Sequence, residues 1–236
     1  MKNSFRYVTA AIFSLALTNI SVAQEQKRID LDAFNELMIG GDFNVILTDD
    51  ASGSLTLKGS KEAVEEVSVT LRNQKLRIEK KKSSYWINFG KSGQRVTVEI
   101  PSTTFKGIYL SGSGKLSGSI KAADQLKVVV SGSGSIQSDL GNAQSINASV
   151  SGSGDLTLTG NCDLLTLQIA GSGNINADEL RANVVEAKIA GSGNGRVHVS
   201  DKLTASIAGS GNLTYSGNPD KVEHSVAGSG RIRSKN

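Results

Sequence analysis

The chain has 236 residues, of which 26 are basic and 22 acidic, so its formal net charge is +4. This near balance, without a clustered basic face, gives no reason to expect nucleic-acid binding. Two prolines and 26 glycines, among many Ser, Thr, Val and Ile residues, favour strands and tight turns over helices.

Residues 1–23 have the features of a secretory signal peptide. Lys2 and Arg6 form a positive start, an apolar stretch follows, and Ser-Val-Ala at 21–23 places small residues where a signal peptidase cuts. The apolar stretch is too short for a membrane-spanning helix, and no later apolar run approaches that length. Removing the leader leaves 24 basic against 22 acidic residues. We therefore expect an exported chain without a transmembrane segment, located in the periplasm, on the outer-membrane surface or outside the cell.

Residues 24–106 form a less regular β region that we expect to be continuous with the repeats after it. The stretch IGGDFNVILT at 39–48 resembles a diverged repeat corner. Three segments alternate apolar and polar residues as strands do: 54–59, 67–80 and 95–100. Asn73 and Gln74 are predicted to make a hairpin turn, and KEAVEEV at 61–67 one helical turn. This region should cover the first coil, because an exposed sheet edge invites pairing with other chains.

The stretch KKKSSYWINFGKSG suggests a ligand site within this region. Alternation places Trp86 on the face opposite Tyr85 and Phe89, beside three lysines. Trp86 would then be a platform for a sugar ring, and Lys81 and Lys82 would attract an anionic glycan. The plainer alternative is that Tyr85 and Phe89 cap the core while Trp86 packs under a loop.

Residues 107–236 carry a Gly-Ser-Gly corner seven times, at intervals of 18 to 20 residues. The corner glycines are Gly112, Gly114, Gly132, Gly134, Gly152, Gly154, Gly171, Gly173, Gly191, Gly193, Gly209, Gly211, Gly228 and Gly230. A period near twenty is typical of a solenoid, in which each repeat is one coil stacked on the last. We expect glycine to prevent a clash at each sharp turn, and the serines between the glycines to form a ladder. Anion binding at seven identical corners is the less economical alternative.

Two apolar columns run through the aligned repeats. The residues directly before the corners are Leu110, Val130, Val150, Ile169, Ile189, Ile207 and Val226. The residues two places after the last corner glycine are Leu116, Ile136, Leu156, Ile175, Leu213 and Ile232. The residues that alternate with the apolar ones along each strand are mostly polar, as expected of strands with one buried side. Gly195 interrupts the second column and Val197 follows late, so we predict a β-bulge there.

No catalytic, metal or cofactor constellation emerges from the remaining residues, and we expect neither a metal nor a cofactor. Cys162, the only cysteine, is predicted to be a small, partly buried filler at a turn. His198 is expected to point outward alone, and His224 to lie in the apolar part of the last coil, neither at metal-ligand spacing. Four scattered acids share no column: Asp139, Asp155, Asp163 and Asp178. They support no paired-carboxylate site. The charged tail, 231–236, is predicted to be a solvated stop.

The order of three features resembles the family named "putative autotransporter adhesin head GIN domain", exported proteins common in Bacteroidetes. The features are FNELMIGGDFNVILT, then RVTVEIPSTTFKGIYLSGSGKL, then the repeated corners, which include GSGNIN. The resemblance covers nearly all of the chain after the leader. It implies an all-β fold, a right-handed parallel β-helix with coils of about 18–20 residues, and a role in adhesion. It implies the shape of pectate-lyase-like proteins without their catalytic residues, and it transfers no functional residue.

These observations together predict a non-enzymatic, exported or cell-envelope β-helix protein that binds a glycan or another surface protein. The long, regular outer face, rich in Ser, Thr, Asn and Gln, suits a repeating polymer. Two alternatives stay open. One is a polysaccharide-processing enzyme, a lyase or hydrolase, that uses carboxylates in a solenoid groove; the other is a purely structural envelope or stress protein. The sequence does not fix the oligomeric state.

Overall fold

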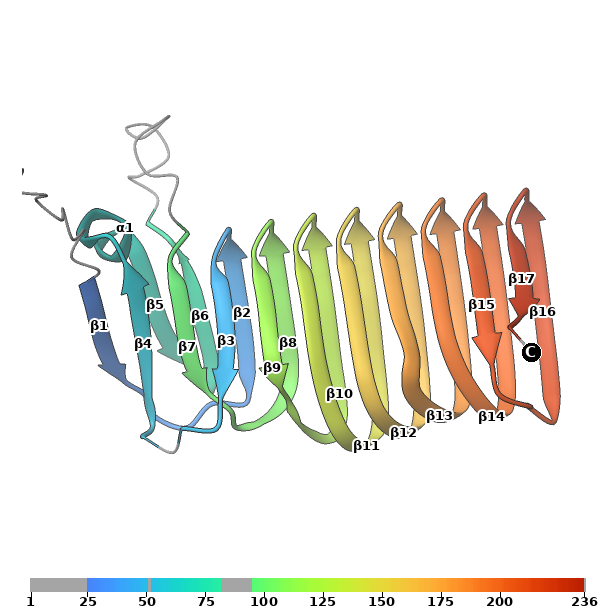
Figure 1. Cartoon of the computed structure of the whole chain (residues 1–236), viewed down its shortest axis with the longest axis horizontal. Coiled ribbons are helices and arrows are strands. Elements are labelled where there is room, and N and C mark those ends of the chain that lie inside the picture. Colours follow the sequence, from blue (N-terminus) through green and yellow to red (C-terminus); the bar gives the residue numbers. More distant parts are fainter. Residues whose placement is uncertain (1–24, 51, 82–94, 236) are drawn as a thin grey trace, which may run out of the picture.

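The computed structural model describes residues 25–50, 52–81 and 95–235, which form an elongated β-solenoid with a cap at its N-terminal end (Figure 1). The elements are β1 (Glu25–Asp30), β2 (Glu36–Gly41), β3 (Asn44–Thr48), β4 (Ser54–Gly59), α1 (Lys61–Glu65), β5 (Val67–Arg72), β6 (Lys75–Lys80), β7 (Thr97–Pro101), β8 (Thr104–Gly112), β9 (Lys115–Ser119), β10 (Lys121–Gly132), β11 (Ser135–Gly152), β12 (Asp155–Gly171), β13 (Asn174–Gly191), β14 (Asn194–Gly209), β15 (Asn212–Ser216), β16 (Lys221–Gly228) and β17 (Arg231–Ser234).

Each coil runs down the front of the solenoid, bends at the bottom, and climbs the back to a Gly-Ser-Gly corner (Figure 1). Each successive coil lies further to the right in Figure 1. A coil that descends at the front, rises at the back and advances to the right is right-handed. The strands pair in parallel and in register, so that Val150 lies beside Val130 on one side and Ile169 on the other. The predicted parallel β-helix is therefore confirmed. From β11 to β14 a single bent strand makes almost a whole coil.

Both predicted apolar columns line the core. Every member of the column before the corners is buried except Val226, which is 39% exposed. The second column is buried as far as Leu213, and only Ile232 is half-buried. Val226 and Ile232 belong to the last coil, which no further coil covers among the described residues. The hydrophobic core is thus a continuous strip along the axis, with one open end.

The corners explain the spacing of the glycines. Gly152 has a φ of +109°, and a Cβ there would lie 2.7 Å from the carbonyl oxygen of Gly132 in the preceding coil. The axial hydrogen bonds at this point run through the backbone: Ser153 N–H donates to Gly132 O at 2.9 Å, and Ser172 N–H to Gly152 O at 2.8 Å. Backbone groups therefore join the corners, where the sequence led us to expect a ladder of serine hydroxyls.

A side-chain ladder stands beside the corners, one residue after the last corner glycine. Asn174 donates to Asp155 at 2.8 Å, Asn194 to Asn174 at 3.0 Å, and Asn212 to Asn194 at 3.1 Å. An amide can donate along the axis in one direction and accept from the other, so identical residues in register propagate the chain of bonds. These side chains are exposed, so each rung adds little stability on its own.

The predicted bulge at Gly195 is wrong. Gly195 stays in register with Ile175 in the coil before it and Leu213 in the coil after it, and Val197 aligns with Ala177. The register shift lies further along the chain, after Ala177. A Cβ on Gly195 would lie 2.7 Å from Cδ1 of Leu213. Glycine is accommodated here because the neighbouring coil's leucine fills its place.

The cap is built outward from a first coil around Gly41, whose φ is +130°. β2 and β3 form this coil and stack directly on β8 and β9, although residues 54–101 separate them in sequence. Strands of this segment extend both faces of the first coil. On one face β6 pairs with β2, and β5 pairs with β6. On the other face β7 pairs with β3, β4 pairs with β7, and β1, which precedes the first coil, pairs with β4. The helical turn α1 and the hairpin turn at Asn73 and Gln74 (φ 51° and 61°) are confirmed.

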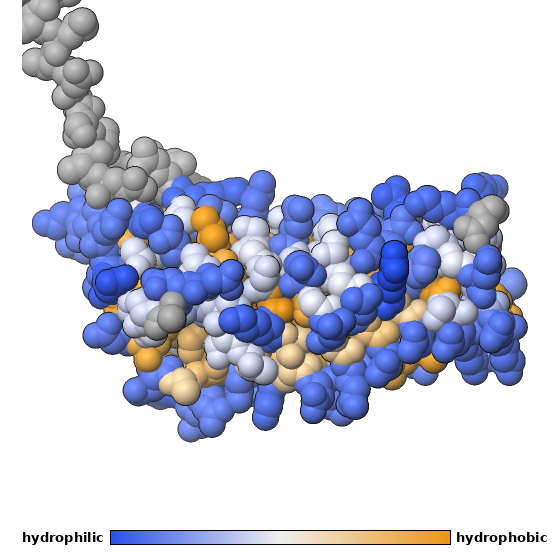
Figure 2. Space-filling view, turned by 60° about the horizontal axis from the view of Figure 1, so that its bottom comes forward, coloured by the Kyte–Doolittle hydropathy of each residue, from blue (hydrophilic) through white to orange (hydrophobic). Residues whose placement is uncertain are grey.

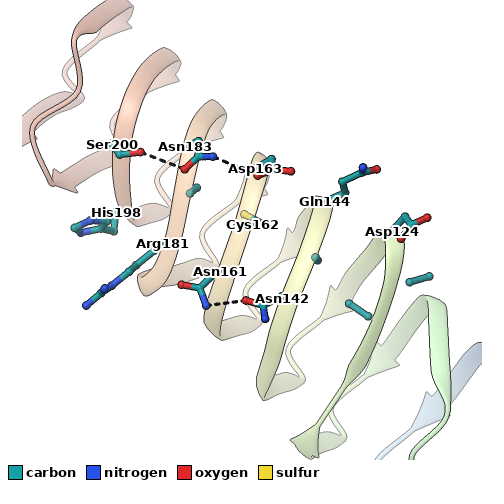
Figure 3. A pocket seen from close by; sticks show the side chains of 14 residues that line it. Asp124, Asn142, Gln144, Asn161, Cys162, Asp163, Arg181, Asn183, His198 and Ser200 are labelled. Atoms are coloured by element: carbon teal, nitrogen blue, oxygen red, sulfur yellow. Dashed lines mark hydrogen bonds between the residues drawn. The ribbon is translucent and has the colours of Figure 1, made fainter.

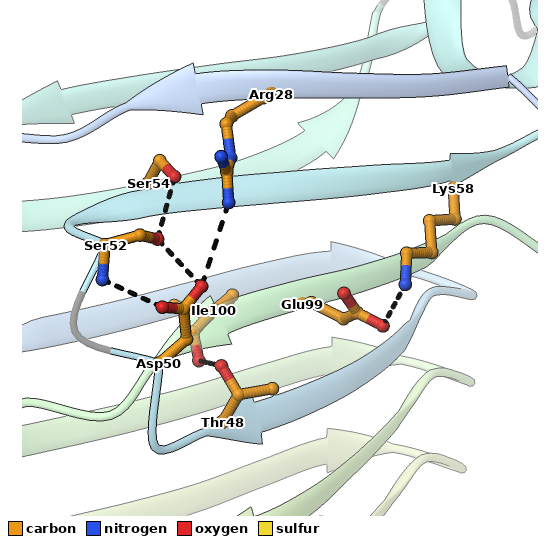
Figure 4. Close-up of polar contacts among 8 residues, drawn as sticks. All are labelled: Arg28, Thr48, Asp50, Ser52, Ser54, Lys58, Glu99 and Ile100. Carbon is orange, nitrogen blue, oxygen red and sulfur yellow. Dashed lines mark hydrogen bonds and ion pairs between the residues drawn. The ribbon is translucent and has the colours of Figure 1, made fainter.

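Polar contacts fasten the outer strands of the cap (Figure 4). Lys58 of β4 pairs with Glu99 of β7 at 2.6 Å across the antiparallel register. In the turn before β4, Asp50 accepts from the backbone N–H of Ser52 at 2.9 Å and from its hydroxyl at 2.8 Å. Arg28 of β1 approaches the same carboxylate at 3.8 Å. The turn and the edge strand are thus tied together.

Residues 231–235 are exposed apart from the half-buried Ile232, as predicted for a solvated stop. Residues 231–234 continue the solenoid as β17, which pairs in parallel with β15. The ladder extends one residue further, because the backbone N–H of Lys235 donates to Tyr215 O at 2.8 Å. His224 lies in register with the buried Ala205 but is itself exposed, because it belongs to the last coil.

Candidate functional site

A groove of about 630 Å³ follows the bottom bend of the solenoid from β10 to β14. Its floor consists of small residues, one from each of β10, β11, β12 and β13: Ala122, Ala143, Cys162 and Ala182. Figure 2 shows this floor as a pale apolar stripe between hydrophilic margins. Cys162 aligns with Ala143 on one side and Ala182 on the other, so the floor is a column of the parallel register. Small side chains at this column leave the bend hollow.

Two polar rims flank the floor (Figure 3). The first rim consists of Asn142, Asn161, Arg181 and His198. The second rim consists of Gln144, Asp163, Asn183 and Ser200. On the first rim Asn161 donates to Asn142 at 3.0 Å. On the second, Asn183 donates to Asp163 at 3.2 Å and accepts from Ser200 at 3.4 Å. These hydrogen bonds between neighbouring coils fix the orientation of the rim side chains. Each amide keeps further donor and acceptor capacity for a ligand.

The groove residues come from stretches such as GNAQS and GNCD, whose variable length between repeats predicts loops that close each coil. They continue the parallel strands, and Asn142 pairs with Asn161 as Ala143 does with Cys162. Sequence reasoning therefore missed the groove. The available signal was a small residue once per coil, between two polar residues, on the side of the coil opposite the corner.

Cys162 lies on the floor and is 5% exposed. Burial raises the pKa of its thiol to about 11, and the negative charge of the adjacent Asp163 adds to this effect. The thiol therefore stays protonated at neutral pH and is a poor nucleophile. This agrees with the predicted role of a small filler.

His198 is not alone, as the sequence led us to expect. Its Nδ1 lies 3.0 Å from the hydroxyl oxygen of Ser216, which donates to Asp178 at 2.8 Å. Lys235 completes the cluster with a 2.5 Å ion pair to the same carboxylate. The Ser216 hydroxyl lies between the acid and the histidine and donates a hydrogen bond to the acid. The order differs from that of a hydrolase triad, in which the histidine stands between the other two residues. The cluster fastens the chain end onto β13 and β14.

The pKa of Asp178 lies below its ordinary value of 3.8. The hydrogen bond from Lys235 is the largest cause, followed by the opposing effect of burial, the hydrogen bond from Ser216 and the nearby positive charges. A lowered folded pKa means that the carboxylate stabilises the fold above its unfolded pKa, and that this is lost as the pH falls through the folded value.

Replacing Asp178 with asparagine is expected to lower the unfolding free energy on the order of 1 kcal/mol at neutral pH. The difference from the parent should vanish at a pH below the lowered pKa of Asp178, because both side chains are then neutral. Urea unfolding at both pH values measures it. Asp201→Asn removes the same charge from an exposed position of β14 and serves as control. An equal loss at both pH values would contradict the assignment.

Of the predicted ligand residues of the N-terminal region, Lys81 lies within the described structure. Lys81 is exposed, and its Nζ donates to the backbone oxygen of Glu65 at 2.5 Å at the cap. Trp86 and Lys82 lie outside the described residues. The four predicted acids remain apart in the register: Asp139 aligns with Thr159, and Asp155 with Asn174.

The described ranges contain no cluster of three or more His, Cys, Asp or Glu side chains suited to a metal ion. Nor does the described part of the chain contain a helix long and apolar enough to cross a membrane.

Comparison with solved structures shows the same fold in other bacterial proteins. A putative adhesin from Bacteroides fragilis is 27% identical, with a TM-score of 0.79 over 89% of this chain and 96% of that one. A putative adhesin from Parabacteroides merdae is 22% identical, with a TM-score of 0.70 over 90% and 96%. A protein from Parabacteroides distasonis described as a putative lipid binding protein is 22% identical, with a TM-score of 0.67 over 90% and 97%.

A search among curated proteins gave no match. The family model described as "Putative auto-transporter adhesin, head GIN domain" matches residues 33–219. This range runs from the residues just before β2 to the connection between β15 and β16. The corners, the capped first coil and the parallel register are thus those of a known family, and the chain belongs to the auto-transporter adhesin head GIN domain family.

Proposed function

We propose that this protein is a non-enzymatic binding protein of the adhesion type, exported to the cell envelope, and that the bottom groove holds one stretch of an extended glycan. The observation that carries the proposal is the pair of polar rims on either side of a small-residue floor, repeated once per coil. A site that repeats along an axis suits a ligand that repeats along an axis.

The chemistry of the rims favours hydroxyl groups. Asn142, Gln144, Asn161 and Asn183 each offer both donors and acceptors, as a sugar hydroxyl does. Coils stack at about 4.8 Å, so successive units of an extended sugar chain meet polar side chains from successive coils. The apolar floor provides contact for the C–H groups of the sugar rings. The groove is lined by two acids, Asp124 and Asp163, and by the basic Arg181. Because charges of both signs are present, a ligand of low charge fits the groove best.

The test combines a glycan array with a groove-blocking variant of the full chain. The half-buried Ala143 forms the floor and packs against the core, so Ala143→Trp would fill the groove, and thermal unfolding checks that the variant is folded. We expect the variant to weaken binding of an array-selected glycan at least about tenfold, or about 1.4 kcal/mol, measured by titration calorimetry. Ser206→Trp places the same ring on the exposed back of β14 and should leave the affinity unchanged.

Three results would overturn or replace the proposal. Unaltered affinity of Ala143→Trp, or an array without a bound glycan, would exclude the groove as a glycan site. Release of products from a polysaccharide panel, abolished by Asp163→Asn, would make the protein an enzyme that uses the acid of the second rim. Binding to lipid vesicles in place of glycans would favour the activity named for the Parabacteroides distasonis neighbour. A structural envelope protein would bind none of these.

A further inference from the structure

The groove does not end at the bottom bend. A second cavity, of about 710 Å³, lies on the back of the solenoid over β8 and β10 and is lined by Tyr109, Lys106, Lys127 and Asn147, among others. Asp124 and Gln144 line both this cavity and the groove. The two hollows are therefore continuous, and a chain lying in the groove reaches the back face at the end nearer the cap.

Tyr109 is the aromatic residue at this point. It lies between the buried residues Ile108 and Leu110 of β8, so its ring projects outward and is half-buried. A Cβ on Gly107 would lie 2.7 Å from Cε2 of Tyr109 and 3.0 Å from its hydroxyl oxygen. The ring therefore leans over Gly107, which is buried although it is on the outer face.

Gly107 is an exception within its own column. It pairs with Lys127 of β10, which in turn pairs with Asn147 of β11, and both carry polar side chains. Only a residue without a side chain leaves room for the ring of Tyr109 to lie down on the sheet. The local sequence thus forms an aromatic surface beside polar groups that point into the same cavity.

We propose that Tyr109 is a stacking platform for a pyranose ring of the bound glycan, and that Lys127, Asn147 and Gln144 hydrogen-bond the substituents of that ring. This inference rests on the proposed function and adds an anchor at one end of the groove. The face of an aromatic ring is electron-rich and attracts the C–H groups of a sugar face. Binding cavities of this size combine an apolar surface with a few polar groups that fix orientation.

The experiment uses the array-selected glycan and three variants of the full chain. Tyr109→Ala is expected to weaken binding at least about tenfold, whereas Tyr109→Phe, which keeps the ring, should bind within about twofold of the parent. Gly107→Ala should weaken binding several-fold, because the new Cβ displaces the ring without removing it. Thermal unfolding of each variant confirms that it is folded.

A second measurement separates stacking from a merely structural role. Saturating the aromatic protons in an NMR saturation-transfer experiment should transfer magnetisation to one sugar ring of the glycan in the parent and in Tyr109→Phe, but not in Tyr109→Ala. If Ala143→Trp abolishes binding while Tyr109→Ala leaves affinity and transfer intact, the platform is excluded and the groove stands. If no glycan binds the parent, the proposed function fails, and the platform with it.

Discussion

Replacing Gly152 with alanine should destabilise the solenoid by at least about 4 kcal/mol, in the range reached only by severe steric or packing defects. Two effects combine at this corner. The φ of +109° is one that residues with a Cβ rarely adopt, and the Cβ would lie 2.7 Å from the carbonyl oxygen of Gly132. That oxygen is fixed by the hydrogen bond from Ser153, so neither backbone can move without separating the coils.

Gly141→Ala is the matched control. Gly141 lies in the same strand, β11, and also has a positive φ, of +61°, but nothing lies within 4 Å of the position that its Cβ would take. Only the left-handed backbone is then penalised, by about 1–2 kcal/mol. Urea unfolding followed by circular dichroism compares the two variants. Equal losses would show that backbone conformation alone, and not the approach of the coils, selects glycine at the corners.

The repeats could be predicted from the sequence because their geometry is local. A Gly-Ser-Gly corner and an alternating strand define one coil, and equal coil lengths bring Val130, Val150 and Ile169 into one column. Nothing in that inference requires a distant contact. The same reasoning identified the diverged corner at Gly41.

The arrangement of the cap could not be predicted in the same way. The stacking of β2 on β8 joins strands with residues 54–101 between them. Alternation within a strand indicates which face is buried but does not identify the strand beside it. The antiparallel additions, such as β4 on β7 and β5 on β6, follow from the excursion leaving and re-entering the stack on its two faces.

The groove and Gly195 illustrate a second limit. Alignment of the repeats assumes that each side chain fills the core space of its own coil. At Gly195 the space is filled by Leu213 of the next coil, so the interrupted column needs no bulge. At the bottom bend, Ala143 and Cys162 resembled loop residues because the stretches around them vary in length, yet they continue the register. Both errors concern packing between coils, which a single repeat does not contain.

Phe105 gives the second large effect, because it joins the cap to the solenoid. Its side chain is fully buried at the start of the floor column, in register with Ala122. Its ring contacts that of Phe34, which precedes β2, at a centroid distance of 5.9 Å and an interplanar angle of 64°. Phe105→Ala should cost about 3–5 kcal/mol through the cavity that it leaves, including about 0.5–1.5 kcal/mol for the edge-to-face pair.

Hydrogen exchange, read by mass spectrometry over separate peptides, distinguishes where that loss falls. We propose that residues 24–106 and the repeats are one continuous unit, so Phe105→Ala should speed exchange in β2 and β6 of the cap and in β8 and β10 of the solenoid by similar factors. Phe105→Leu keeps most of the volume and should cost less than about 1.5 kcal/mol. Faster exchange confined to the cap strands would instead show a separate N-terminal domain that unfolds independently of the coils. The aromatic pair would then be a contact between two domains, since loss of a shared core residue must weaken both sides of a single cooperative unit.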